Sequence, residues 1–357
     1  MTNFTTSAAF MDRFGISLPI LQSPMAGVST PEMAAAVSNA GGLGALGVGA
    51  ATVTQAEQML RQAAILTDGP ININVFCHEP AVQDLARENM WLQRLAPVFH
   101  KYDANPPQKL HEIYTSFCVD ADMQAMVLAQ SPAVVSFHFG IPPQAVISAL
   151  RAAGILLLAT ATSLAEARML EAAGLDAIVA QGWEAGGHRG VFDPTAKDAR
   201  LETMTLVREL VAGVELPVIA AGGLMAGSDI AQAIASGAVA AQLGTAFIAC
   251  PESSADDGYR AALQANDLQT EMVSVISGRP ARCLRNRFTE WAAEIDGELI
   301  PDYPIAYDAG KALNVAAKQA GEMGYGAQWA GQGAASTRAV PVADLMRLLE
   351  AELAEAK

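Results

Sequence analysis

Residues 217–247 read PVIAAGGLMAGSDIAQAIASGAVAAQLGTAF and contain one complete unit of the expected fold. Two apolar runs, residues 218–221 and 239–243, have the composition of strands that are buried on both faces, as parallel strands are. The segment between them ends at Gly237, and glycine is the usual residue just after a helix. The stretch therefore predicts a strand, a covering helix and a second parallel strand.

The same alternation runs through the first 250 residues. Six further apolar runs are expected strands, at residues 19–22, 43–47, 71–76, 133–137, 155–159 and 177–181. Eight strands that alternate with helices predict an α/β fold of the (β/α)8 TIM-barrel type, in which the loops after the strands carry the chemistry.

Two stretches break this alternation. Residues 79–132 are too long for one crossover helix and predict a helical insertion over the mouth of the barrel. After residue 243 about a hundred residues follow that are expected to be mainly helical, with loop-like segments at 277–288 and 301–311. We expect a barrel over residues 1–250, a helical lid over 251–330, and a C-terminal helix within 331–357 that packs back on the barrel.

Composition excludes several classes of partner. The chain has 22 Lys and Arg against 37 Asp and Glu, a net charge of −15, and no cluster of cations that would bind nucleic acid or an anionic membrane. An anionic substrate would therefore need a few local cations. The four widely spaced cysteines form no disulfide framework. The polar N-terminal segment and the absence of a long apolar run predict a cytoplasmic protein. The sequence does not determine the oligomeric state.

Glycine turns after the last two strands predict an anion site. Gly222 and Gly223 follow one strand, and residues 242–245 (Gln-Leu-Gly-Thr) follow the next. Barrels commonly bind phosphate there, although tight turns without a ligand are an alternative. The G-x-G-x-x-G spacing at 42–47 enters a strand instead of following one, so it is interpreted as a structural turn.

Two histidines are candidates for catalysis. His188 lies in a loop at 181–190 that contains four glycines, which suits a flexible ligand-binding loop but also a merely solvated side chain. His138 ends a predicted strand, where a catalytic residue or a core histidine is expected. The HExxH, GxSxG and P-loop motifs are absent from the sequence, so metal-dependent or triad hydrolysis has no support.

Tyr303, Tyr307 and Lys311 recur at a spacing of four residues in a chain with only six tyrosines. On a helix they would share one face. That face is either a packing surface or a rim of hydroxyls and one cation at the barrel mouth.

Six segments together resemble the nitronate monooxygenase family, formerly called 2-nitropropane dioxygenases, and its class I members in particular. They are QSPMAG at 22–27, NINV at 72–75, SFHFG at 136–140, AGGHRG at 185–190, AGG at 221–223 and QLGT at 242–245. The resemblance extends from about residue 16 to residue 333.

The resemblance implies a non-covalently bound FMN, no metal, and a set of site residues. The implied FMN contacts are Met25, Ala26, Asn74, Gln181, Gly186, Gly223, Gln242, Leu243, Gly244 and Thr245. The implied catalytic residues are His188 and His138. The implied substrate contacts are Tyr114, Tyr259, Tyr303, Tyr307 and Lys311.

The implied activity is detoxifying oxidation of alkyl nitronates, with propionate 3-nitronate as the expected substrate. Dioxygen is the second substrate, a flavin semiquinone is the intermediate, and a carbonyl compound with nitrite or nitrate is the product. Two alternatives remain at this point. One is an FMN-dependent NAD(P)H reductase of quinones or enoyl thioesters on the same fold, and the other is a flavin-free barrel that binds a phosphorylated metabolite.

Overall fold

The apolar runs form eight parallel strands in a computed structural model that describes residues 5–356. Their order around the barrel is β1-β9-β8-β6-β5-β4-β3-β2. Leu43 closes the ring, because its N–H donates to the Ile20 carbonyl at 3.0 Å and its carbonyl accepts from the Gln22 N–H at 2.9 Å. The predicted TIM barrel is therefore confirmed. The strands are β1 (Ile20–Gln22), β2 (Gly44–Gly47), β3 (Ile71–Phe76), β4 (Val134–His138), β5 (Leu156–Ala161), β6 (Ala177–Gln181), β8 (Val218–Ala221) and β9 (Ala240–Leu243).

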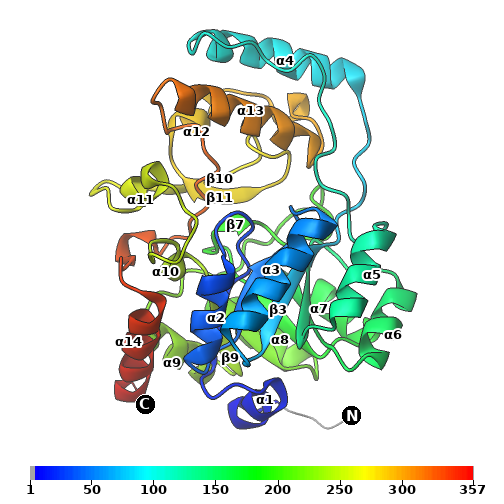
Figure 1. Cartoon of the computed structure of the whole chain (residues 1–357), viewed down its shortest axis with the longest axis vertical. Coiled ribbons are helices and arrows are strands. Elements are labelled where there is room, and N and C mark those ends of the chain that lie inside the picture. Colours follow the sequence, from blue (N-terminus) through cyan, green and yellow to red (C-terminus); the bar gives the residue numbers. More distant parts are fainter. Residues whose placement is uncertain (1–4, 357) are drawn as a thin grey trace.

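Helices cover the outside of the barrel, each with an apolar face against the strands (Figure 1). They are α2 (Pro31–Asn39), α3 (Val53–Leu66), α5 (Ala121–Gln130), α6 (Gln144–Ala152), α7 (Leu164–Ala173), α8 (Thr203–Gly213) and α9 (Gly227–Ala235). The C-terminal α14 (Val342–Glu355) packs against α9 and α2, where only the short α10 (Thr245–Ile248) follows β9. Across residues 5–356 none of the helices has the length and apolar character needed to cross a membrane.

The N-terminal end of the barrel is closed by α1 (Ser7–Phe14), which lies below the strands in Figure 1. Phe10 and Phe14 belong to one buried cluster with Leu158 and Ile219 of the strands. The amino ends of the strands are therefore filled with apolar side chains, and only their carboxyl ends are free to form a site.

A second layer lies over the carboxyl ends of the strands (Figure 1), and we call it the cap. It is built from residues 85–100 and 270–319, with its own hydrophobic cluster that includes Trp91, Phe99, Phe288 and Leu313. Its elements are α4 (Leu85–His100), β10 (Thr270–Val273), β11 (Ala281–Leu284), α12 (Arg287–Ala292), η1 (Gly297–Leu299) and α13 (Ile305–Gln319). Next to it lie α11 (Asp257–Leu263) and η2 (Ala334–Ser336), which share a buried cluster with Leu284 of β11.

The stretch 79–132 does not form a single insertion over the mouth of the barrel. Its first helix, α4, packs against α13 and η1 on the far side of the cap, and Arg87 at its start pairs with Asp302 at 2.6 Å. Its second helix, α5, packs beside α3 and α6 as a helix of the barrel. The apolar face of α4, which includes Trp91, finds its partner in the cap cluster and not over the cavity.

The expectation of a mainly helical lid is wrong for residues 270–284. This stretch forms the antiparallel pair β10 and β11, and β11 also pairs with β7 (Gly187–His188) in the loop after β6. Short strands of this kind lack a clear sequence signal, because their partners lie far away along the chain. The pairing fastens the His188 loop to the cap.

Only part of the Tyr303–Lys311 pattern is helical. The helix α13 begins at Ile305, so Tyr307 and Lys311 share its face but Tyr303 precedes it. Tyr303 reaches the same cavity from the preceding turn.

Candidate active site

A cavity of about 820 Å³ opens between the carboxyl ends of the barrel strands and the cap. The candidate residues of the sequence that line it are Met25, Ala26, Asn74, Tyr114, His138, Gln181, Gly186, His188, Gly223, Gln242, Gly244, Thr245, Tyr259, Tyr303, Tyr307 and Lys311. Leu243 is the exception, because its side chain is 1% exposed and belongs to the core between strands and helices. Neighbouring strand residues point to opposite faces, so Gln242 faces the cavity and Leu243 faces away.

Bare glycine backbone surrounds one end of the cavity. Gly222 and Gly223 have φ values of +132° and +72°, a region that favours glycine. A Cβ on Gly186 would lie 2.5 Å from the backbone nitrogen of Gly331, and one on Gly244 would lie 3.2 Å from Ser23. Side chains are thus kept out of this end, and a ligand can approach the backbone directly. The arrangement fits the phosphate of a cofactor.

Hydrogen bonds of side chains in and just after β1, and in β3, fix the cavity wall next to these glycines. The Ser29 hydroxyl accepts hydrogen bonds from the Met25 N–H at 3.0 Å and from the Gln22 amide at 2.9 Å, which fixes the turn after β1. Asn74 on β3 donates its amide to the backbone and hydroxyl oxygens of Ser136 at 3.1 and 3.0 Å. Its other amide atom, Oδ1, is left to accept a hydrogen bond.

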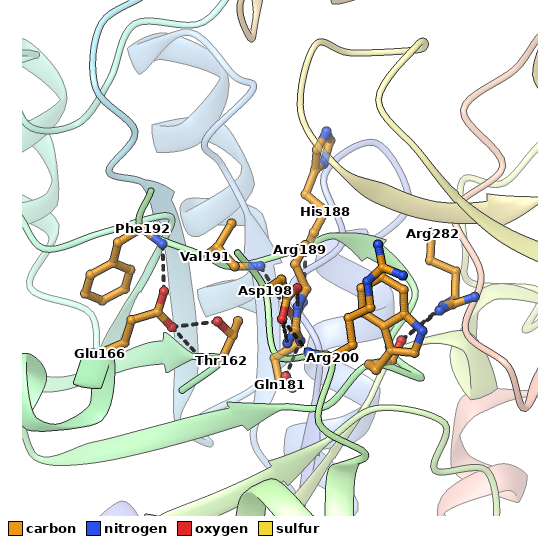
Figure 2. Close-up of polar contacts among 12 residues, drawn as sticks. Thr162, Glu166, Gln181, His188, Arg189, Val191, Phe192, Asp198, Arg200 and Arg282 are labelled. Atoms are coloured by element: carbon orange, nitrogen blue, oxygen red, sulfur yellow. Dashed lines mark hydrogen bonds and ion pairs between the residues drawn. The ribbon is translucent and has the colours of Figure 1, made fainter. Parts of the chain in front are cut away.

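The loop after β6 is held firmly, although the sequence predicted a flexible one. Gln181 donates to the His188 carbonyl at 2.9 Å and accepts from the Gly190 N–H at 2.7 Å. Arg189 pairs with Asp198 at 2.7 Å and also donates to the Gln181 carbonyl (Figure 2). The His188 imidazole points away from this cluster. Hydrogen bonds of Gln181 and Arg189 therefore fix the glycine-rich loop in place.

A second anchor follows His188 along the same loop. Glu166 accepts a hydrogen bond from the Phe192 N–H at 2.9 Å with one carboxylate oxygen. Its other oxygen accepts from the backbone and hydroxyl groups of Thr162 at 2.6 and 2.7 Å (Figure 2). The loop is therefore fixed to the loop after β5 as well.

His188 is a neutral imidazole in this environment. Burial, and then repulsion from His138, Arg279 and His78 in their protonated forms, lower its pKa from the usual 6.5 to about 3. Its Nε2 lies 2.9 Å from the Ser277 hydroxyl. The ring therefore enters the cavity uncharged and oriented by a hydrogen bond.

His138 has no ring nitrogen left for a ligand. Its Nε2 lies 3.1 Å from the His188 carbonyl, which can only accept, so Nε2 carries the hydrogen. In the neutral ring Nδ1 then accepts from the Thr160 hydroxyl at 2.9 Å. Burial lowers the pKa of His138 to about 4, which keeps this ring neutral too. The geometry makes His138 a support for the backbone of His188.

Aromatic side chains form the cap side of the cavity. The Tyr303 ring lies 5.3 Å from that of His188, and its buried hydroxyl has no hydrogen-bond partner in residues 5–356. Trp329, which the sequence did not single out, lies 4.9 Å from His188 on another side. The Tyr259 hydroxyl donates to the Trp329 carbonyl and is not free. Burial raises the pKa of Tyr307 to about 12 and raises that of Tyr303 well above its usual value, so both hydroxyls stay protonated.

Lys311 supplies a cation at the rim. Its Nζ lies 4.8 Å from the centre of the Tyr114 ring and 5.3 Å from that of Tyr307. Partial burial lowers its pKa, which shows that some of its hydration is lost. Within the described part of the chain no carboxylate lies within 4.0 Å of it. The charge is therefore available to an anionic ligand.

Sequence reasoning missed the segment 277–279, which had been assigned to a loop. Ser277 contacts His188 across 89 positions of the chain, so no local pattern connects them. The buried Arg279 lies 4.3 Å from the Phe139 ring centre and donates to the Val191 carbonyl. The nearby His78, 1% exposed, also escaped notice, since nothing around it in the sequence marks it.

The fold and site define a (β/α)8-barrel enzyme whose neutral histidine faces the ligand cavity. More particularly, the chain belongs to the nitronate monooxygenase family, since the sequence model described as "Nitronate monooxygenase" matches residues 7–352. This family of oxidoreductases is flavin-dependent.

Individual relatives agree with this assignment. The chain is 58% identical over 354 residues to a nitronate monooxygenase of Paraburkholderia phytofirmans. The aligned region covers 99% of this chain and 97% of that protein. It is 50% identical over 347 residues to a nitronate monooxygenase of Pseudomonas aeruginosa, with coverage of 96% and 99%. Its structure is similar to that of a nitroalkane oxidase from Streptomyces ansochromogenes, with a TM-score of 0.88, 40% identity and coverage of 98% of both chains.

Proposed function

We propose that this nitronate-oxidising enzyme uses FMN and dioxygen, and that it converts alkyl nitronates to carbonyl compounds with release of nitrite or nitrate. The observation that carries the proposal is the pairing, along one cavity, of the neutral His188 ring with the Tyr303 side chain, whose ring lies 5.3 Å away. Such a pair suits a small molecule with a nitro group, which needs a hydrogen-bond donor and, in its neutral form, a base.

The residues that would hold FMN are those around the bare end of the cavity. Gly223 and residues 242–245 would receive the phosphate, and Met25, Ala26 and Asn74 would lie along the ring system with Gln181 and Gly186. A bound flavin supplies electron-accepting chemistry that protein side chains lack. The contribution of the chain is to bind and orient the substrate beside that ring.

Each polar group near His188 has a distinct task in this proposal. The Tyr303 hydroxyl, which is protonated and buried without a partner in residues 5–356, would donate a hydrogen bond to a nitro oxygen once a small rotation of its side chain turns it toward the substrate. His188 takes the α-proton when a neutral nitroalkane is bound. His138 is a positioning residue, since both of its ring nitrogens bind protein groups. Tyr114 and Tyr259 contribute mainly packing to the cavity wall.

The rim favours a nitronate that also carries a carboxylate. Lys311 has no carboxylate within 4.0 Å among residues 5–356, in a protein with a net charge of −15, and Tyr307 lies beside it. A carboxylate bound there would receive a charge-assisted hydrogen bond. Propionate 3-nitronate has both groups and is the substrate that we propose.

Anaerobic mixing tests the reaction class. We expect a nitronate to change the visible absorbance of the bound flavin within the turnover time, and NADH to leave it unchanged. In air, the nitronate should be consumed together with dioxygen, and nitrite or nitrate should form. Rapid bleaching by NADH without any response to nitronates would favour the reductase alternative. A colourless protein would favour the flavin-free alternative. The family assignment supports neither the reductase nor the flavin-free alternative.

A further inference from the structure

The buried Ser277 is placed to decide which nitrogen of His188 carries the hydrogen. Its side chain is 0% exposed and lies between β10 and β11. The Ser277 hydroxyl is 3.2 Å from the Arg279 carbonyl and 2.9 Å from Nε2 of His188. The contact with His188 has an ordinary hydrogen-bond length, and the contact with the Arg279 carbonyl is a longer hydrogen bond.

The direction of the two bonds is linked through the single hydroxyl proton of Ser277. When both bonds form, that proton must point to the Arg279 carbonyl, because a carbonyl oxygen can only accept. The hydroxyl oxygen then accepts from His188, whose Nε2 must carry a hydrogen. In a neutral imidazole the other nitrogen, Nδ1, is left with the lone pair.

Because the surroundings keep the His188 ring neutral, only one of its two nitrogens carries a hydrogen. Arg279 is 4% exposed and, among residues 5–356, has no carboxylate within 4.0 Å. Together with burial and the neighbouring His138 and His78, its charge opposes protonation of His188. The other side chains whose rings lie against His188 are uncharged: Phe139, Tyr303, Tyr307 and Trp329.

The lone pair is accessible from the cavity. Nδ1 of His188 has no hydrogen-bond partner in the described part of the chain, yet it is not one of the buried unpartnered polar atoms. His188 itself lines the cavity. A ligand can therefore reach Nδ1.

We propose that Ser277 is a positioning residue that holds His188 as the Nε2–H tautomer and so turns a basic Nδ1 toward the substrate. This inference rests on the proposed role of His188. In the proton transfer, the Cα–H bond of a nitroalkane breaks, its electron pair stays on the substrate to form the nitronate, and Nδ1 binds the proton. The new nitronate anion stabilises the imidazolium beside it, an attraction that the free protein lacks.

Nitrogen NMR tests the tautomer without turnover. In the flavin-loaded enzyme labelled with ¹⁵N-histidine, long-range ¹H–¹⁵N spectra at pH 7 distinguish protonated from unprotonated ring nitrogens. The chain has only five histidines, and the signals lost in His188→Asn assign His188. We expect a protonated Nε2 and an unprotonated Nδ1 in the native enzyme. An Nδ1–H form or an imidazolium would overturn the proposal.

Substitutions supply the second readout. Ser277→Ala should populate the Nδ1–H form and lower kcat/KM for a neutral nitroalkane about tenfold, the effect of one unmade hydrogen bond to a buried N–H. It should change kcat/KM for a preformed nitronate much less, because that substrate needs no base. Ser277→Thr, which keeps the hydroxyl, should restore the native spectrum and the nitroalkane rate. An unchanged His188 spectrum in Ser277→Ala would refute the role of Ser277.

Ser38 offers a matched control. Its hydroxyl donates to the Pro70 carbonyl at 2.7 Å and accepts from the Gly44 N–H at 3.1 Å, the same pattern as Ser277, but it does not line the cavity. Ser38→Ala should lower stability and leave both the His188 spectrum and the ratio of the two kcat/KM values unchanged. An equal change of that ratio in both variants would show a general structural effect and overturn the proposal.

Two outcomes separate this inference from the proposed function. If Ser277→Ala does not fold, Ser277→Cys retains the volume with a weak acceptor, and the native spectrum still decides the tautomer. If the native enzyme shows the expected tautomer but turns over no nitronate, the proposed function fails and the inferred hydrogen-bond direction stands.

Discussion

Replacing Lys311 with methionine should weaken the use of propionate 3-nitronate and leave an uncharged alkyl nitronate nearly unaffected. Met removes the ammonium but keeps an unbranched chain that can still pack on Tyr114 and Tyr307. Because Lys311 has no carboxylate within 4.0 Å in residues 5–356, the substitution breaks no ion pair there. A large loss of stability is therefore not expected.

The structure sets the size of the effect. A hydrogen bond to a charged group contributes about 1.5–3 kcal/mol, and each 1.4 kcal/mol corresponds to about a tenfold change. Lys311 is exposed at the rim, where solvent screens the charge, which favours the lower end of this range. We expect kcat/KM for the carboxylated nitronate to fall about tenfold, mainly through a higher KM, since the contact lies away from the reacting atoms.

Steady-state kinetics on both nitronates would test this expectation, with Lys311→Arg as the charge-retaining control. The ratio of the two kcat/KM values should fall in Lys311→Met and remain near native in Lys311→Arg. If methionine changed both substrates equally, or neither, then Lys311 would be a solvated residue and the carboxylate would bind elsewhere.

Three further predictions concern the histidines and the glycine turns. His188→Asn should lower the rate on neutral nitroalkanes by a factor of about 10²–10⁴ and retain much of the activity on preformed nitronates. Equal losses on both substrates in parallel assays would show that His188 binds the substrate and is not the base. Gly244→Leu should reduce the flavin absorbance per protein, because its Cβ meets Ser23 at 3.2 Å, although its φ of −116° tolerates a side chain. The exposed Gly297→Leu, with open space around its Cβ, should retain full flavin content. Equal flavin content in both variants would show that the flavin binds elsewhere. The buried, neutral histidines should make stability fall as pH drops below 6.5, since the folded-state pKa of His78 is about 4 and the unfolded chain binds more protons in that range. Urea midpoints at pH 7 and pH 5 measure this loss, His78→Leu should reduce it, and equal midpoints in the native protein would contradict it.

The barrel was predictable because its strands carry their own signal. Parallel strands are buried on both faces, so each appears as a continuous apolar run, and the eight predicted runs match the strands to within about two residues. Glycines at the helix ends and after β8 and β9 are also local requirements of the backbone. These local rules therefore predict where the cavity lies and where its glycine turns lie.

The cap was less predictable because its elements depend on distant partners. β10 and β11 are four-residue strands that form only against each other and against β7. The helix α4 finds its apolar partner about two hundred positions away, in α13. Tyr303 reaches the cavity from outside the helix that its spacing had suggested.

The sequence alone determined which chemical groups stand after which strands, since residue order and strand alternation are local properties. It placed His188 after β6, His138 at the end of β4 and glycine turns after β8 and β9. Only the tertiary structure decided what these groups can do. The charge and tautomer of His188 depend on burial and on Ser277, 89 positions away, while His138 is occupied by the His188 backbone. Protonation is set by the surrounding dielectric and hydrogen-bond partners, and those exist only once distant segments have packed together.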